Sequence, residues 1–143
     1  MRQSFVLTFE NGLPKGTAQQ KGETARYKNG KPFVFHYKKS SVESANQLFA
    51  YKLKPYAPST PITGCISLTV SLFFSVKERA KWGKYKPSRP DADNYCKELV
   101  DVMGSLGWWL DDAQIVKLKI EKRYAEKASI FIHCEEVFDD VIQ

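Results

Sequence analysis

The sequence predicts a single α+β domain spanning residues 1–143, with elements in the order β-α-β-α-β-β, a mixed or antiparallel sheet and two main helices. The length of 143 residues matches one domain, and a hydrophobic content of 43% is enough for a buried core. Segments with strand-like alternation are interspersed with segments of helical period, without an internal repeat. The last residues, from about 135 to 143, are expected to form an acidic tail.

The first half of the chain predicts one strand, one hairpin and one helix. A short β-branched and aromatic run predicts the strand at Ser4–Phe9. Asn29-Gly30 separates Thr24–Lys28 from Phe33–Tyr37 and is typical of a two-residue hairpin turn. This hairpin falls in a lysine-rich stretch, which is either a ribbon that follows DNA or a solvated excursion. Apolar residues at a period near 3.6 predict the helix at Ser44–Tyr56.

The second half begins with a predicted strand at Cys65–Val76, whose inward face presents Ile66, Leu68, Val70 and Leu72. Residues 92–106 predict the second helix, because one stripe of it carries Ala92, Tyr95, Cys96, Leu99, Val102, Met103 and Leu106. Gly104 or Gly107 is expected to end this helix.

The final two strands follow from alternation of apolar and charged residues. The first is predicted to turn Val116, Leu118 and Ile120 toward the core. Its hairpin partner is Ala128–Cys134, with Ile130 and Ile132 turned inward.

Several classes of protein are excluded by composition. No apolar run approaches the roughly 20 residues of a membrane span, and Met1–Ser4 leads into a strand rather than a signal segment. We therefore expect a cytoplasmic protein. The three cysteines, Cys65, Cys96 and Cys134, have no C-x-x-C spacing. Buried free thiols are expected rather than disulfides or structural zinc.

The net charge is unevenly distributed along the chain. The whole chain carries +6, and four carboxylates among the last nine residues contribute −4, so residues 1–134 carry +10. A charge of this size favours a polyanionic partner such as nucleic acid. Ordinary solvated surface is the alternative.

A basic loop with interleaved aromatic residues follows the Cys65–Val76 strand. Aromatic rings stack on unpaired bases while cations hold the phosphate backbone, so we predict DNA contacts here from Lys77, Arg79, Lys81, Trp82, Lys84, Tyr85, Lys86 and Arg89. The alternative is that Trp82 packs against the domain and the lysines are only solvated.

Acidic residues concentrate in two motifs of this basic chain. Asp91 and Asp93 begin the second predicted helix, and Asp111-Asp112 follows the aromatic turn at Trp108-Trp109. Taken singly, the first two are explained as a helix cap and a charge favourable to the helix dipole. With a third ligand from Asp111-Asp112 they predict one site of hard oxygen ligands, which suits Mg²⁺, with Mn²⁺ expected to substitute.

The spacing Asp91-x-Asp93-Asn94-x-x-Lys97, followed by Gly107-Trp108-Trp109-Leu110-Asp111-Asp112-Ala113-Gln114, resembles the RusA family of Holliday junction resolvases. The resemblance is strong from Arg89 to about Ile120. It implies that the catalytic residues are Asp91, Asp93, Asp112 and Lys97, with the three aspartates as metal ligands. It gives Asp111 a less critical place, and Asn94 is expected to orient a carboxylate or a phosphate.

Near the N-terminus, Pro14-Lys15-Gly16 matches the start of a basic motif that the family often has, which implies a DNA contact at Lys15. Thr17-Ala18-Gln19 follows here, where the family often has Arg-Pro-Arg.

The resemblance further implies a homodimeric, Mg²⁺-dependent endonuclease that resolves four-way junctions in DNA recombination and repair, in the cytoplasm of a bacterium or of a phage-infected or lysogenic host. A two-fold dimer supplies two identical sites for a junction of approximate two-fold symmetry. The apolar strands and Trp108-Trp109 are candidates for its interface. Alternatives are a nuclease acting broadly on flaps and forks, a catalytically inactive DNA-binding accessory protein, and an RNA-binding protein whose acids only cap helices.

Overall fold

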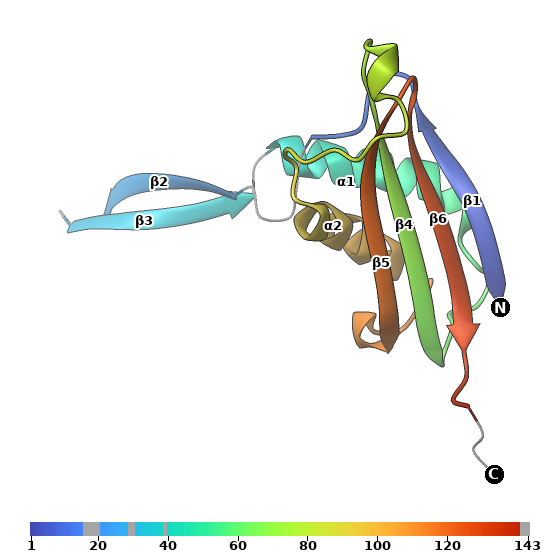
Figure 1. Ribbon diagram of the computed structural model, residues 1–143. Helices are drawn as coiled ribbons and strands as arrows, with labels where there is room; N and C mark the ends of the chain where they lie inside the picture. Colours follow the sequence, from blue (N-terminus) through green and yellow to red (C-terminus); the bar gives the residue numbers. More distant parts are fainter. Residues whose placement is uncertain (16–20, 29–30, 39, 141–143) are drawn as a thin grey trace.

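The computed structural model describes residues 1–15, 21–28, 31–38 and 40–140, and it has the predicted α+β architecture (Figure 1). The elements are β1 (Arg2–Phe9), β2 (Lys21–Lys28), β3 (Lys31–Lys38), α1 (Ser40–Leu53), β4 (Cys65–Ser75), α2 (Ala92–Ser105), β5 (Ile115–Ala125) and β6 (Ala128–Val137). Short 3₁₀ turns lie at η1 (Lys54–Tyr56), η2 (Arg79–Lys81) and η3 (Asp112–Gln114). The predicted strands and helices are present. α1 begins four residues before the prediction, and β5 continues to Ala125, beyond the residues that predicted it.

The main sheet has the strand order β1-β6-β4-β5. β4 pairs with β5 in parallel, and the other neighbours are antiparallel. A parallel pair needs a long crossover, and α2 supplies it between β4 and β5. Both helices lie on one face of the sheet, whereas the β2–β3 hairpin projects away from it (Figure 1).

The core lies between that face and the two helices. In β4 the four residues predicted to face inward are all fully buried, and so are Ile130 and Ile132 of β6. Alternate residues of a strand point to opposite sides, and this explains why a strict period of two in the sequence gives one buried face. From the helices, Phe49, Leu53, Leu99 and Met103 fill the same core.

The helix α2 follows the predicted stripe closely. Tyr95, Cys96, Leu99, Val102 and Met103 are buried. Its C-cap is Leu106, and Gly107 follows with a φ of +92°, a left-handed conformation in which glycine has no side-chain penalty. The amide of Trp108 then donates to the carbonyl of Met103, which turns the chain back toward the core.

The inward face predicted for β5 is wrong in part. Ile115 and Ile120 pack against the core, but Val116 and Leu118 are 55% and 52% exposed. β5 lies at the edge of the sheet, and the register with β4 shifts between Ile66 and Ser67. α2 therefore covers only part of this strand.

Both residues of the Trp108-Trp109 pair are buried, with exposed fractions of 0% and 3%. The indole nitrogen of Trp108 donates to Oε1 of Gln3 at 3.1 Å, and its ring stacks near Phe5. As core residues, the two tryptophans present no surface to a second chain, which removes them from the predicted interface candidates.

The three cysteines are free thiols, but their predicted burial holds for only two of them. Cys96 and Cys134 are buried, whereas Cys65, at the first position of β4, is exposed. Burial raises the pKa of the Cys96 thiol to about 12 and that of Cys134 to about 11. Among the described residues, no helix is long and apolar enough to cross a membrane.

We predict that one thiol reacts quickly in the folded protein. A reagent must reach the sulfur atom, and burial disfavours the reactive thiolate. Cys65 should therefore react with a disulfide reagent within minutes, while Cys96 and Cys134 should react only after unfolding. The measurement is a thiol titration with and without denaturant, with Cys65→Ser as the control. Two or more fast thiols in the native protein would contradict the packing of the core.

Candidate active site

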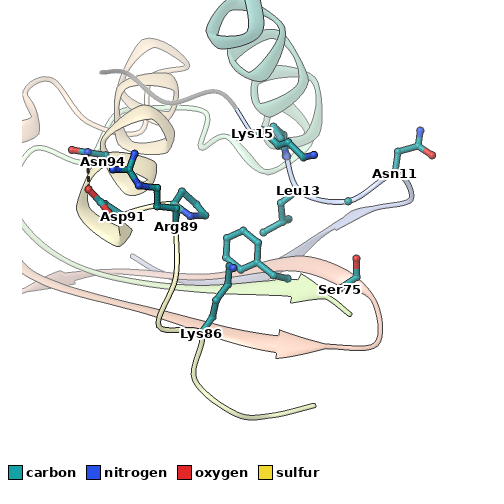
Figure 2. Close-up of a pocket in the computed structure, with 12 residues that line it drawn as sticks. Asn11, Leu13, Lys15, Ser75, Lys86, Arg89, Asp91 and Asn94 are labelled. Atoms are coloured by element: carbon teal, nitrogen blue, oxygen red, sulfur yellow. Dashed lines mark hydrogen bonds between the residues drawn. The ribbon is translucent and has the colours of Figure 1, made fainter. Parts of the chain in front are cut away.

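The first cluster of predicted site residues lies at the N-terminal end of α2. Asp91 is the N-cap residue, with φ −66° and ψ 133°, and its side chain makes no capping hydrogen bond. Nδ2 of Asn94 donates to its Oδ2 at 3.4 Å (Figure 2). Asp91, Asp93 and Lys97 are all exposed. The two carboxylates therefore face solvent, with their oxygen atoms available to a ligand.

The segment before Asp91 is held in place by β5. Nζ of Lys122 donates to the carbonyl oxygens of Ser88 and Pro90, both at 2.8 Å. The amide of Lys86 donates to the carbonyl of Lys122 at 3.0 Å. A lysine of the sheet thus fixes the backbone that leads into the acidic cluster, and sequence reasoning had given Lys122 no role.

The second acidic motif forms η3, between α2 and β5. Asp111 is its N-cap and accepts from the amide of Ala113 at 2.9 Å, and Oε1 of Gln114 accepts from the amide of Asp111 at 2.9 Å. This reciprocal pair is a capping box. Nε2 of Gln114 also donates to the carbonyls of Ile62 and Gly64. Asp111 is thus occupied with holding the turn, while Asp112 is left to project from it.

The carboxylate of Asp112 is oriented by a buried tryptophan. Nε1 of Trp109 donates to Oδ1 of Asp112 at 2.7 Å, a short bond of the charge-assisted kind. Sequence reasoning missed this role of Trp109 and that of Gln114. The spacing of Asp111 and Gln114 matches a capping-box pattern, so the sequence could have predicted the role of Gln114.

One copy of the chain does not bring the three predicted metal ligands together. A Cβ atom at Gly104 would lie 3.0 Å from Oδ1 of Asp112, so this aspartate sits beside the C-terminal end of α2. Asp93 lies eleven residues earlier, which is about 16 Å along the helix axis. Accordingly, the part of the chain that the structure describes holds no group of three His, Cys, Asp or Glu residues that is close enough for one metal ion.

The separated groups nevertheless share one side of α2. Residues 93, 97 and 104 are spaced i, i+4 and i+11, which places them within about 40° of one another around the helix axis. One line along the helix therefore carries Asp93 and Lys97 and ends at Gly104, beside Asp112. The donor types fit Mg²⁺, which prefers carboxylate oxygens and water and keeps an incomplete protein shell. Carboxylates of this donor type lie at both ends of α2.

A basic cleft opens beside Asp91. It has a volume of about 730 Å³ and is bounded by the segment Asn11–Lys15, the end of β4 at Phe74 and Ser75, and residues between Lys86 and Asn94. Figure 2 shows Arg89 close to Asp91 and Asn94, with Lys15 on the neighbouring segment. The hydroxyl of Tyr95 donates to the carbonyl of Pro14 at 2.7 Å. Burial raises the pKa of Tyr95 above its ordinary value, which keeps this donor protonated.

The predicted DNA-binding loop is divided between exposed and anchored residues. Lys77, Arg79, Lys81, Lys84, Tyr85 and Arg89 are exposed. Trp82 is half-buried, and its indole nitrogen donates to the carbonyl of Val76 at 3.0 Å, so it packs against the domain. The exposed ring of Tyr85 is backed by the guanidinium of Arg123, 4.1 Å from its centroid. Of the two aromatic residues in the loop, Tyr85 is the one exposed to solvent.

Exposed carboxylates beside a cleft lined by cations are the arrangement expected of a protein class that acts on nucleic-acid phosphates. Comparison with known proteins assigns the class directly. Residues 12–135 match the family model described as Endodeoxyribonuclease RusA. The chain therefore belongs to the RusA family of endodeoxyribonucleases.

Two relatives support this assignment. The chain is 34% identical over 134 residues to the crossover junction endodeoxyribonuclease rusA of Lactococcus phage r1t, covering 93% of this chain and 98% of the phage protein. It is also 32% identical over 102 residues to YqaN of Bacillus subtilis, a protein described as uncharacterized, covering 64% of this chain and 71% of that protein.

The Trp109–Asp112 bond predicts a selective effect on DNA cleavage. Trp109→Phe keeps the buried ring but removes the donor, so we expect cleavage to fall about 10- to 100-fold, as for other residues that orient a ligand, while stability changes by about 1 kcal/mol. The matched control is Trp108→Phe, which removes the bond to Gln3 and does not touch Asp112. Cleavage rates and thermal melts of both variants decide the question, and equal loss of cleavage in both would refute an orienting role.

Proposed function

We propose that this protein is a Mg²⁺-dependent endonuclease that resolves four-way DNA junctions by paired, symmetric nicks and acts as a homodimer in DNA recombination and repair. The observation that carries the proposal is the exposed Asp91–Asp93 pair beside the basic cleft. The proposal is also supported by the 34% identity of the chain to a phage crossover junction endodeoxyribonuclease. The same similarity supports the proposal that the protein acts in the cytoplasm of a bacterium, either as a cellular protein or in a phage host.

Each site residue has a distinct task in this proposal. Asp91, Asp93 and Asp112 are the metal ligands. A bound Mg²⁺ or Mn²⁺ lowers the pKa of a coordinated water and stabilises charge on the phosphate under attack. Lys97, exposed one turn beyond Asp93, supplies a cation to the negative charge that develops there. Lys15, Lys86 and Arg89 bind phosphates of the DNA backbone.

The separation of Asp112 from Asp93 gives the homodimer a catalytic reason. If two copies place their α2 helices side by side and antiparallel, the N-terminal end of each helix meets the C-terminal end of the other. Asp91 and Asp93 of one copy then join Asp112 of the partner copy, and a two-fold axis generates two such sites. The line formed by Asp93, Lys97 and Gly104 is the side of α2 that this arrangement requires.

Exposed apolar residues border that side of α2. Leu110, Val116 and Leu118 are 73%, 55% and 52% exposed. Within the described residues, the outer edge of β5 makes backbone hydrogen bonds to the loop only near its C-terminal end. There Lys122 and Tyr124 pair with Gly83, Lys84 and Lys86. Residues 115–121 therefore combine apolar side chains with an unbonded strand edge, the combination that favours contact with a second chain.

The first test is cleavage of a labelled synthetic four-way junction beside linear duplex, with Mg²⁺ and with EDTA. The expected result is paired symmetric nicks near the crossover, only with metal and only in the junction. Equal cutting of flaps and forks would favour the broader nuclease, and tight binding without cutting in Mg²⁺ or Mn²⁺ would favour the inactive accessory protein.

Asp93→Asn is expected to separate binding from cleavage. The substitution keeps the size of the side chain but removes a charged metal ligand, so cleavage should fall by about 100- to 1000-fold or more, while junction binding in EDTA stays largely intact. The matched control is Asp139→Asn, which alters an exposed carboxylate in the acidic tail. Loss of binding in proportion to cleavage would remove Asp93 from the catalytic set.

Mixed dimers test whether each site is shared between two chains. A dimer of one Asp93→Asn chain and one Asp112→Asn chain retains one complete site if the ligands come from different chains, and none if they come from the same chain. We expect it to nick one strand of the junction. The reciprocal control pairs a wild-type chain with a chain carrying both substitutions, and it should be inactive. The opposite pattern, an inactive first dimer and an active control, would show that each chain builds its own site.

A further inference from the structure

The basic cleft combines cations with apolar and amide side chains, which phosphate binding alone does not require. Among the described residues that line it, Lys15, Lys86 and Arg89 face one carboxylate, Asp91, so the charge of this lining favours an anionic ligand. Nζ of Lys86 is held by Oγ of Ser88 at 2.8 Å and lies 5.3 Å from the centroid of the Phe74 ring. This cation is fixed in place above an aromatic face rather than free in solvent.

The same cleft has an apolar part. Leu13, Pro14, Phe74 and Pro90 line it together with the cations. Inorganic phosphate or the backbone of a continuous duplex would make no use of these carbon surfaces, because the bases of a duplex are stacked inside it. A base that leaves its stack needs an apolar or aromatic surface to replace its neighbours. The lining thus matches a base and its phosphate together.

Two side-chain amides complete the chemistry. Asn11 lies on the rim contributed by the segment after β1, and Asn94 on the rim contributed by α2. A carboxamide offers both a donor and an acceptor, which is what the polar edge of a base requires. Nδ2 of Asn94 is engaged with Asp91, so Asn11 is the amide left for an incoming base.

The walls of the cleft are held by long-range hydrogen bonds. The Tyr95 hydroxyl anchors the carbonyl of Pro14, and Lys122 anchors the carbonyl of Pro90. A site formed before its ligand arrives avoids the entropy cost of ordering loops on binding. This preformed state distinguishes the cleft from the exposed lysines of the 77–84 segment.

We propose that the basic cleft binds one unpaired nucleotide of the cleaved strand, next to the scissile phosphate, with its base against the apolar wall of the cleft and its phosphate on Lys15 and Arg89. The inference rests on the proposed function, because a DNA branch point is the source of an unstacked nucleotide beside the cut. Asn11 then contributes to the choice of base at that position.

The experiment places 2-aminopurine, whose fluorescence rises when it leaves the stack, at each position flanking the cut of a four-way junction. Binding is measured in EDTA, so that the readout does not depend on cleavage. We compare the wild-type protein with Ser75→Trp, which places a large ring at the exposed mouth of the cleft, and with Thr8→Trp, a matched change at an exposed position of β1 outside the cleft. Cleavage of junctions with randomised core sequence is measured in Mg²⁺ for the wild type and for Asn11→Ala.

The expected result is a fluorescence rise at one flanking position with the wild type and with Thr8→Trp, and loss of most of that rise with Ser75→Trp. Junction affinity of Ser75→Trp should fall about tenfold, as when one base loses its stacking partner. Asn11→Ala should flatten the base preference at the same position. No rise at any flanking position, or the same rise with Ser75→Trp as with Thr8→Trp, overturns the inference. A rise without cleavage in Mg²⁺ supports the nucleotide site while rejecting the proposed nuclease, so the two failures are distinct.

Discussion

The packing of α2 across the sheet is the constraint on which the rest of this structure depends. Its apolar stripe is buried in the core between the sheet and α1, so the rotation of the helix about its axis is fixed, and with it the direction of every exposed residue. The side that remains outside carries Asp93 and Lys97 and ends beside Asp112. A helix of 14 residues, about 21 Å long, therefore sets both the line on which the acidic residues lie and the distance that separates them.

The surroundings of the carboxylates are fixed by hydrogen bonds to buried or anchored partners. Trp109 is 3% exposed and holds Asp112, and Lys122 spans from β5 to the backbone before Asp91. Tyr95, fully buried in the core, ties the N-terminal segment to the same region. Each of these residues is anchored in the core or in the sheet and bonds to the site with its side chain. Side chains of this kind transmit the rigidity of the core to surface groups, which would otherwise pay an entropy cost to stay oriented.

Local patterns in the sequence predicted the elements, the inward residues of β4 and β6, and the N-cap position of Asp91, since each depends on a period or a cap that neighbouring residues specify. The errors have a different origin. Val116 and Leu118 alternate as inward residues do, but whether a neighbouring element covers them depends on the edge position of β5 and the reach of α2. Cys65 likewise has apolar neighbours and still lies exposed at the start of its strand. The sequence also did not predict the distance between Asp93 and Asp112. The two motifs are close in sequence, but α2 separates them by most of its length.

That separation bears directly on how a junction would be cut. A chain that carried a complete site could nick one strand alone, and a four-way junction cut once is not resolved. On the proposed assembly, no site is complete until two copies meet, and the same contact that completes one site completes the other. Cleavage would then begin only with both sites present, one for each of two symmetric strands. Dividing the ligands between the ends of α2 would thus couple assembly to paired cutting without any change in the conformation of either chain.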